Sequence, residues 1–318
     1  MLFLKKERLT LKRNGFHNMK KISVWISSMR LRTLPLSISG IIVASCFAEY
    51  NGYFSWIIFV LAILTTLSFQ ILSNLANDYG DGVKGTDNED RIGPDRAIQS
   101  GKISPEEMLN AIKINVLISI ALAFSLIFKA FGVHHVLLTL IFFVLGIFSI
   151  VAAIRYTVGG NAYGYKGFGD VFVFVFFGLV SVCGCYVLYA KTIDHVTILP
   201  ACTIGLLSTA VLNLNNMRDL VSDEMSKKNT LAVKLGPKAI KKYHFTLIVL
   251  AIILSGVFGV LYYTSPFSLI FVVAYIPLVK HLIKVYKNKE PRLLDPELKK
   301  LALTTVLLSV LLGIGYLL

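Results

Sequence analysis

Two groups of amide and carboxylate side chains stand where apolar stretches of this 318-residue chain give way to charge. The first group consists of Asn74, Asp78 and Asp81, and the second of Asn215, Asp219 and Asp223. Spacings of i, i+4, i+7 and of i, i+4, i+8 place each group on one face of a helix. Mg²⁺ prefers such oxygen ligands, and proteins bind it through one or two carboxylates alongside substrate phosphates. Two such faces opposite one another are therefore predicted to hold a diphosphate through bridging Mg²⁺ ions.

A plainer interpretation makes these acids solvated residues that cap helix ends. Either group alone fits that interpretation as well, since short motifs are weak evidence. Two groups, each with an asparagine one turn before the first carboxylate and with basic residues after the second, favour a site. Acids at a membrane edge also call for a functional explanation. The amides of Asn74 and Asn215 are expected to complete the coordination or to orient the carboxylates.

Basic residues follow both groups: Lys84, Arg91, Arg96 and Lys102 after the first, and Lys227, Lys228 and Lys234 after the second. Cations in these positions would neutralise a diphosphate leaving group as charge grows on its bridging oxygen. The alternative is that they only fix the orientation of the chain in a membrane, which suits most of them. Arg91 and Arg96 are preferred as ligands because they lie among acids within the loop.

A third polar stretch, RYTVGGNAYGYKGFGD, runs from Arg155 to Asp170. Its glycines permit close approach of the backbone. The ring of Tyr156 is predicted to face an electron-poor carbon centre, with its hydroxyl bound to a polar acceptor. An aromatic belt at the membrane interface explains Tyr163 and Tyr165 equally well.

The composition indicates that these polar stretches belong to a membrane protein. The chain is 55% hydrophobic and only 16% charged, with a mean hydropathy of +0.70, whereas soluble domains carry about 25% charged residues. The apolar residues come in blocks of about 20, which is the length of a membrane-spanning helix. Helices are expected because lipid leaves backbone polar groups without water. An all-α, multi-pass membrane protein follows, and its net charge of +14 is attributed to membrane orientation rather than to nucleic-acid binding.

About nine transmembrane helices are expected. After a first segment that ends near residue 50, they cover approximately 54–77, 106–130, 134–154, 170–190, 196–217, 240–263, 266–286 and 299–318. Alternate loops are strongly basic, and these loops carry both acidic groups. The positive-inside rule then places the N-terminus and the acidic groups in the cytoplasm, and an odd number of helices places Leu318 outside. Residues 1–22, with Met1 or Met19 as the natural start, are expected to form a basic cytoplasmic tail before a single domain at 23–318.

Three stretches together resemble the UbiA-type intramembrane prenyltransferase superfamily: NLANDYGDGVKGTDNEDRIGPDRAIQSGKI, RYTVGGNAYGYKGFGDVFVFVFFG and NNMRDLVSDEMSKKNTLAVKLG. Within it they are most similar to the 1,4-dihydroxy-2-naphthoate prenyltransferases of the menaquinone pathway. The resemblance covers Ser28 to Leu318. It implies a UbiA-type helical bundle in the cell inner membrane, with the active site opening to the cytoplasmic side.

The resemblance also implies roles for individual residues. The implied Mg²⁺–diphosphate ligands are Asp78, Asp81, Asp219 and Asp223, and the accompanying amides are Asn74, Asn77 and Asn215. The superfamily's commoner first motif, NDxxDxxxD, is broken at its last position, where Gly85 stands with Asp87 two residues later. Asp87 is therefore omitted from the predicted ligands.

The implied reaction is Mg²⁺-dependent transfer of a polyprenyl group from its diphosphate to 1,4-dihydroxy-2-naphthoate, with loss of CO₂, giving demethylmenaquinone. Arg155 or Lys166 is the candidate to bind the acceptor carboxylate. The expected partners are these two substrates and the lipid bilayer, with no obligate protein partner evident. The expected basic diphosphate ligands are Lys84, Arg91, Arg96 and Lys102.

Three other functions compete with this prediction. A prenyltransferase of the same superfamily with another aromatic acceptor would share every motif. A CDP-alcohol phosphotransferase would explain Asp78-x-x-Asp81-Gly82, but its signature does not continue here, and it leaves the second acidic group unexplained. A multi-pass transporter predicts charges near mid-membrane, whereas these acids lie at the ends of apolar segments.

Overall fold

The computed structural model describes residues 22–31, 33–86, 92–93 and 96–318, and all regular secondary structure in these ranges is helical. Eight spans are long and apolar enough to cross a membrane: α4 (Trp56–Lys84), α5 (Pro105–Phe131), α6 (Val136–Arg155), α7 to α8 (Gly169–Ala190), η3 with α9 (His195–Arg218), α11 (Leu231–Leu261), η4 with α12 (Pro266–Lys287) and η5 with α13 (Pro291–Leu317). A shorter apolar segment, Leu34–Tyr50, contains α2 (Leu34–Ser37) and α3 (Ser39–Tyr50). The predicted all-α membrane fold is confirmed, with a number of spans close to the nine expected.

Two helix boundaries differ from the sequence prediction. Helix α4 continues to Lys84, so Asp78 and Asp81 are helical rather than part of a loop. At 29 residues it is about 43 Å long, which exceeds a hydrocarbon core of about 30 Å and leaves its acidic end outside lipid. The prediction began helix α11 at residue 240 because the preceding turns are basic, whereas the helix begins at Leu231. It is broken at Gly236, where φ is 75°.

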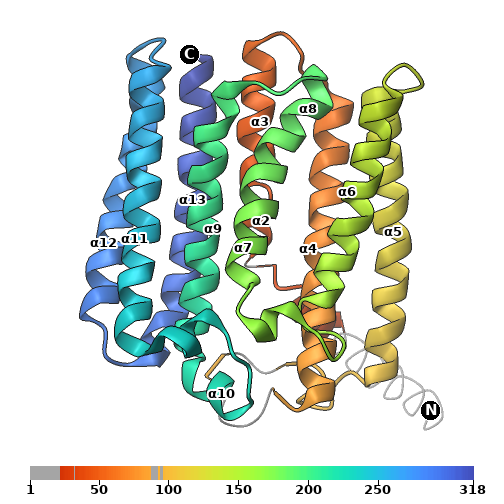
Figure 1. Cartoon of the computed structure of the whole chain (residues 1–318), viewed down its shortest axis with the longest axis vertical. Coiled ribbons are helices and arrows are strands. Elements are labelled where there is room, and N and C mark those ends of the chain that lie inside the picture. Colours follow the sequence, from red (N-terminus) through yellow and green to blue (C-terminus); the bar gives the residue numbers. More distant parts are fainter. Residues whose placement is uncertain (1–21, 32, 87–91, 94–95) are drawn as a thin grey trace, which may run out of the picture.

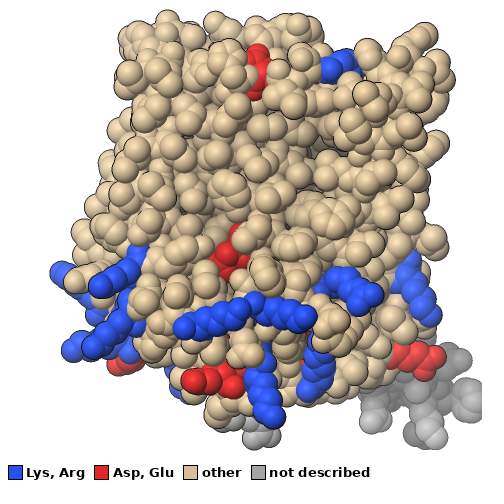
Figure 2. Space-filling model, viewed as in Figure 1, with Lys and Arg blue, Asp and Glu red and all other residues tan. Residues whose placement is uncertain are grey.

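The helices stand side by side, and the longer connections between them lie at one end (Figure 1). The short helix α10 (Leu220–Met225) lies at this end, and Leu318 lies at the other. Lysines and arginines cluster around the α10 end, whereas the surface above them is almost uncharged in this view (Figure 2). This distribution is the one that the sequence predicts for a bundle with a single basic membrane face. The predicted tail, 1–22, falls almost wholly outside the described residues.

Helix α9 is the central helix of the bundle. Of its most apolar stretch 67% is buried, the largest share among the eight spans of the described chain. It packs against α11, α13 and the π-helical segment η2 (Phe174–Gly184), which joins α7 (Gly169–Val173) to α8 (Cys185–Ala190). By contrast, only 11% of the corresponding stretch of α6 is buried. Helix α9 therefore carries the second acidic group from the middle of the bundle, while α6 presents most of its surface to lipid.

Close backbone packing between η2 and α9 depends on Gly178. A Cβ at this position would lie 2.5 Å from the carbonyl oxygen of Ala201 and 2.8 Å from Cα of Gly205. Gly178→Ala is therefore expected to lower stability by about 1–3 kcal/mol, measured as a lower midpoint of thermal unfolding in detergent. Gly184→Ala is the matched control, since its Cβ would meet nothing closer than 3.6 Å. Equal midpoints for both variants would contradict this packing.

Candidate active site

A cavity of about 820 Å³ lies within the bundle and is polar at one end. Its apolar wall includes Phe142, Leu145, Phe172 and Phe176. Its polar wall contains the following side chains: Arg30, Asn74, Asn77, Asp78, Asp81, Arg96, Lys102, Tyr156, Asn215, Asn216 and Lys228. Ligand cavities of about 300–1,000 Å³ with few polar groups are typical binding sites. The arrangement suits a molecule with a charged head and a long apolar tail.

Asp78 and Asp81 share one face of α4 and both line the cavity, as their spacing predicts. Oδ2 of Asp78 accepts a hydrogen bond from the backbone N–H of Ala97, at 3.3 Å. Oδ1 of Asp78 is buried and accepts no hydrogen bond from the described residues. A buried carboxylate oxygen without a partner is costly. This oxygen is therefore oriented and desolvated in a way that suits a cation.

Asp81 is held by groups from several other parts of the chain. The hydroxyl of Tyr165 donates to Oδ1 of Asp81 at 2.8 Å, and the hydroxyl of Thr86 lies 2.6 Å from that of Tyr165. The ammonium group of Lys228 lies 3.3 Å from Oδ2 of Asp81. Arg30 and Arg96 are further electrostatic neighbours of this carboxylate. Asp81 is thus an anion surrounded by donors.

The second acidic group lies where α9 ends and α10 begins. Asp219 is the junction residue, yet its N–H still donates to Asn215 O at 3.1 Å, and the N–H of Asp223 donates to Asp219 O at 2.9 Å. The helical spacing is therefore kept across the junction. Both carboxylates are buried, although it is Asn215 rather than either of them that lines the cavity.

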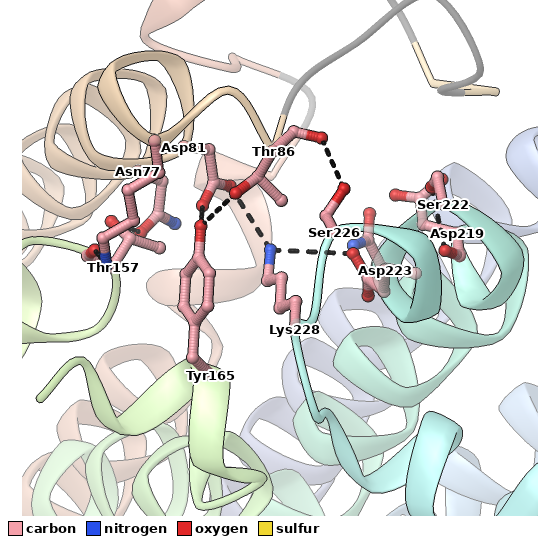
Figure 3. A network of polar contacts seen from close by, with 12 residues as sticks. Asn77, Asp81, Thr86, Thr157, Tyr165, Asp219, Ser222, Asp223, Ser226 and Lys228 are labelled. Atoms are coloured by element: carbon pink, nitrogen blue, oxygen red, sulfur yellow. Dashed lines mark hydrogen bonds and ion pairs between the residues drawn. The ribbon is translucent and has the colours of Figure 1, made fainter. Parts of the chain in front are cut away.

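The two acidic groups meet across Lys228 (Figure 3). Its ammonium lies 3.3 Å from Asp81 and 3.9 Å from Asp223, and its side chain is only 13% exposed. Ser226, beside it, donates to the backbone oxygen of Thr86 at 3.3 Å and links the two loops. The structure therefore brings together the two faces that the sequence predicts to lie opposite one another, with a positive charge between them.

The other predicted ligands divide into two sets. Asn74, Asn77, Arg96, Lys102 and Tyr156 line the cavity. Lys84, Arg155 and Lys166 are exposed and are not part of the cavity wall. Lys84 instead donates to the backbone oxygens of Thr157, at 2.6 Å, and Gly159, at 3.0 Å, which ties the third polar stretch to α4. Arg91 lies outside the described residues.

Three tyrosines of the third polar stretch are at or near the polar end of the cavity. Burial raises the pKa of Tyr165, and the charge of Asp81 raises it further, so that its hydroxyl stays protonated and donates. Burial likewise raises the pKa of Tyr156, with Asp170 and Asp81 adding to the effect. Burial raises the pKa of Tyr163, whose hydroxyl donates to Ala152 O at 2.9 Å. All three act as neutral hydroxyls rather than as bases.

The sequence did not single out three cations of this region. Lys228 stands in a run with Lys227, and nothing in the local pattern distinguishes the two. Arg30 enters the cavity wall from a turn where its own φ is 52°. From the sequence, Arg218 is predicted to be one of the basic residues that orient the chain in the membrane. In the structure it is fully buried beside Asp219. Its position within the last turn of an apolar helix, directly before an acid, was the available signal.

The donor set suits Mg²⁺ bound together with a diphosphate. All the groups concerned offer hard carboxylate or amide oxygens, the ligands that Mg²⁺ prefers, and Oδ1 of Asp78 is a buried oxygen in need of a partner. Among the described residues no three His, Cys, Asp or Glu side chains converge on one point. Proteins commonly bind Mg²⁺ through one or two carboxylates together with substrate phosphates.

Comparisons with known proteins identify relatives of this chain. Residues 38–316 match the model of the UbiA prenyltransferase family. The chain is 41% identical to the 1,4-dihydroxy-2-naphthoate octaprenyltransferase of Escherichia coli (strain K12), over 93% of the chain and 95% of the relative. It is 42% identical to the protein of the same name from Haemophilus influenzae, over 94% of the chain and 97% of the relative.

A solved structure shares the fold. It is a UbiA homologue from Archaeoglobus fulgidus bound to GPP and Mg²⁺, with a TM-score of 0.62 and 15% identity over 91% of this chain and 99% of that one. The polar-ended cavity, the family match over nearly the whole chain and these relatives favour an enzyme over a transporter or a CDP-alcohol phosphotransferase. This chain is a member of the UbiA prenyltransferase family.

Proposed function

We propose that this chain transfers a polyprenyl group from polyprenyl diphosphate to 1,4-dihydroxy-2-naphthoate in a Mg²⁺-dependent reaction. The acceptor loses its carboxylate as CO₂, and the products are demethylmenaquinone and diphosphate. The names of the relatives that are 41–42% identical support the acceptor. The observation that carries the proposal is the meeting of Asp81 and Asp223 across Lys228 at the polar end of a largely apolar cavity.

In this proposal the carboxylates of Asp78, Asp81, Asp219 and Asp223 hold the diphosphate through Mg²⁺. The metal, when bound, would neutralise charge on the departing diphosphate. Lys228, Arg96 and Lys102 line the cavity and would add positive charge at the same place. Asn74 donates from Nδ2 to Met29 O at 2.9 Å, and its Oδ1 accepts from Nε2 of Gln70 at 3.3 Å, so both ends of the amide are held. These residues bind and orient the leaving group.

The apolar wall would hold the prenyl chain and keep water from the allylic carbon. Phe172 and Phe176 stack with centroids 6.2 Å apart, and both line the cavity. Exclusion of water protects a reactive cation from hydrolysis. The ring of Tyr156 lines the cavity near the acids, where a neutral aromatic face stabilises developing positive charge. Arg155 and Lys166 are exposed residues of the third polar stretch. They would have to meet the acceptor carboxylate at the cavity mouth.

We also propose the orientation in the membrane. Basic side chains gather at the α10 end of the bundle, and the positive-inside rule assigns that end to the cytoplasm. The active site then opens toward the cytoplasm from the cell inner membrane, and Leu318 lies on the outer side. This orientation lets water-soluble 1,4-dihydroxy-2-naphthoate reach the polar end directly.

A product assay tests the proposal. Purified protein in lipid nanodiscs would be incubated with Mg²⁺, polyprenyl diphosphate and 1,4-dihydroxy-2-naphthoate, while prenylated product, CO₂ and diphosphate are measured. We expect all three to appear together and EDTA to stop their formation. Prenylated product without CO₂ would refute the decarboxylation, and product only with a different aromatic acid would refute the acceptor.

Tyr165→Phe tests how Asp81 is held. The variant keeps the ring beneath Lys84, whose ammonium lies 4.1 Å from its centroid, but removes the hydroxyl that donates to Asp81. We expect kcat to fall by about tenfold, because one hydrogen bond to a charged group contributes about 1.5–3 kcal/mol. Tyr79→Phe is the control, since Tyr79 is half-buried on α4, the helix of Asp81, and does not line the cavity. An unchanged kcat for Tyr165→Phe would show that Asp81 needs no such donor.

A further inference from the structure

The last residue of α9, Arg218, organises the second acidic group. Its side chain has no exposed surface. Nε donates to Oδ1 of Asp219 at 2.8 Å, and one terminal nitrogen, Nη2, donates to Oδ2 of Asp219 at 2.6 Å and to Oδ1 of Asn215 at 3.0 Å. The other terminal nitrogen, Nη1, donates to Oδ1 of Asp295 at 2.5 Å. One guanidinium thus links both predicted ligands on α9 to the first turn of α13.

The fork geometry makes this contact specific. A guanidinium is planar and presents five N–H groups in fixed directions, so that a paired bond to both oxygens of a carboxylate fixes its plane. A lysine supplies the same charge but not the plane. A buried arginine is also costly unless its charge and hydrogen bonds are satisfied. Asp219 and Asp295 together meet that need.

The charges of the three side chains suggest a second role for Asp295. Arg218 by itself would cancel the charge of Asp219, and a divalent cation would be attracted weakly to a neutral pair. Asp295 brings the sum of the three formal charges to −1. It comes from 77 residues further along the chain, and its side chain is 33% exposed, at the edge of the site.

We infer that Arg218 and Asp295 are positioning residues of the site: Arg218 fixes the carboxylate plane of Asp219 and the amide of Asn215, and Asp295 restores the negative charge that Arg218 removes. This inference rests on the proposed function, because it concerns the cation held by the second acidic group. A competing explanation is that Asp295 only stabilises the bundle. It lies in the first turn of α13, where an acid is favourable near the helix N-terminus, and it bridges α9 to α13.

Binding of Mn²⁺, followed by electron paramagnetic resonance, separates the two explanations. Full-length protein would be titrated with Mn²⁺ in the presence of inorganic diphosphate. Asp295→Asn keeps the shape and the acceptor oxygen but removes one charge. We expect its dissociation constant for Mn²⁺ to rise about three- to tenfold, because the variant removes one negative charge from the neighbourhood of the cation. At saturating Mg²⁺ its kcat should approach that of the original chain.

Arg218→Lys has a different expected result. It keeps the charge but loses the fork, so kcat should stay low at any Mg²⁺ concentration, while the midpoint of thermal unfolding reports whether the variant is folded. Glu290→Gln is the matched control: Glu290 is exposed, five residues before Asp295, and does not contact Arg218. It should bind Mn²⁺ as the original chain does.

The inference is overturned if Asp295→Asn binds Mn²⁺ with unchanged affinity, or if Glu290→Gln weakens binding equally. A purely structural role would lower the unfolding midpoint of Asp295→Asn and leave its Mn²⁺ affinity unchanged. Failure of the proposed function gives a different result. In that case the original chain binds Mn²⁺ and diphosphate but forms no prenylated naphthoate. That result would leave the positioning of Asp219 supported by the Mn²⁺ data.

Discussion

Asp78→Ala is expected to abolish prenyl transfer while the protein stays folded. We expect kcat to fall by about 10³-fold or more, because loss of a metal ligand removes several kcal/mol of stabilisation from the departing diphosphate. The unfolding midpoint should hardly change. Oδ1 of Asp78 is buried without a hydrogen bond from the described residues, so the substitution removes a costly group along with a single 3.3 Å contact to Ala97.

The measurement combines the product assay with thermal unfolding in detergent. Glu49→Gln is the control, since Glu49 is an exposed acid at the opposite end of the bundle, and its activity should match that of the original chain. Asp78→Ala turnover within tenfold of the original chain would refute the assignment of Asp78 as a ligand. A large fall in the unfolding midpoint would mean that Asp78 is needed for folding instead.

Lys228→Met is expected to weaken the binding of polyprenyl diphosphate and to strengthen the binding of a divalent metal ion. The ammonium lies between Asp81 and Asp223, where it would bind diphosphate but also compete with a metal ion. We expect kcat/KM for polyprenyl diphosphate to fall by about 10²-fold, as for loss of a charged donor to a leaving group. Without diphosphate, Mn²⁺ should bind more tightly, because two carboxylates then face one another with no cation between them.

Lys227→Met is the matched control for this pair of measurements. Lys227 is the preceding residue and is exposed, so the same change of net charge occurs at the same end of the bundle. Kinetics with varied polyprenyl diphosphate and Mn²⁺ titration of the substrate-free protein give the two readouts. Weaker Mn²⁺ binding by Lys228→Met would show that the lysine supports the metal rather than competing with it.

The local sequence pattern was sufficient to predict the helices and the helical face that each acidic group occupies. Apolar blocks of about 20 residues predicted the spans because lipid permits few other structures. The i, i+3 spacing placed Asp78 with Asp81 on one face, and the structure confirms that α4 continues through both. The prediction ended this helix at Asn77 because hydropathy falls there, although backbone hydrogen bonding does not depend on hydropathy.

Contacts between distant parts of the chain decided the rest of the site. Lys228 reaches Asp81 across 147 positions and Arg218 reaches Asp295 across 77, and no local spacing distinguishes Lys228 from Lys227. Lys84, predicted as a diphosphate ligand, donates instead to the carbonyls of Thr157 and Gly159.

The sequence by itself determined the membrane-spanning class, the number of spans to within one, the faces of the acidic groups and the family that the chain resembles. Each of these depends on periodicity or on short motifs, which neighbouring residues define. Only the tertiary structure decided which cations enter the site and that Arg218 binds both Asp219 and Asp295. Helix packing brings such residues together, and a long flexible cation can turn toward the cavity or away from it at little cost.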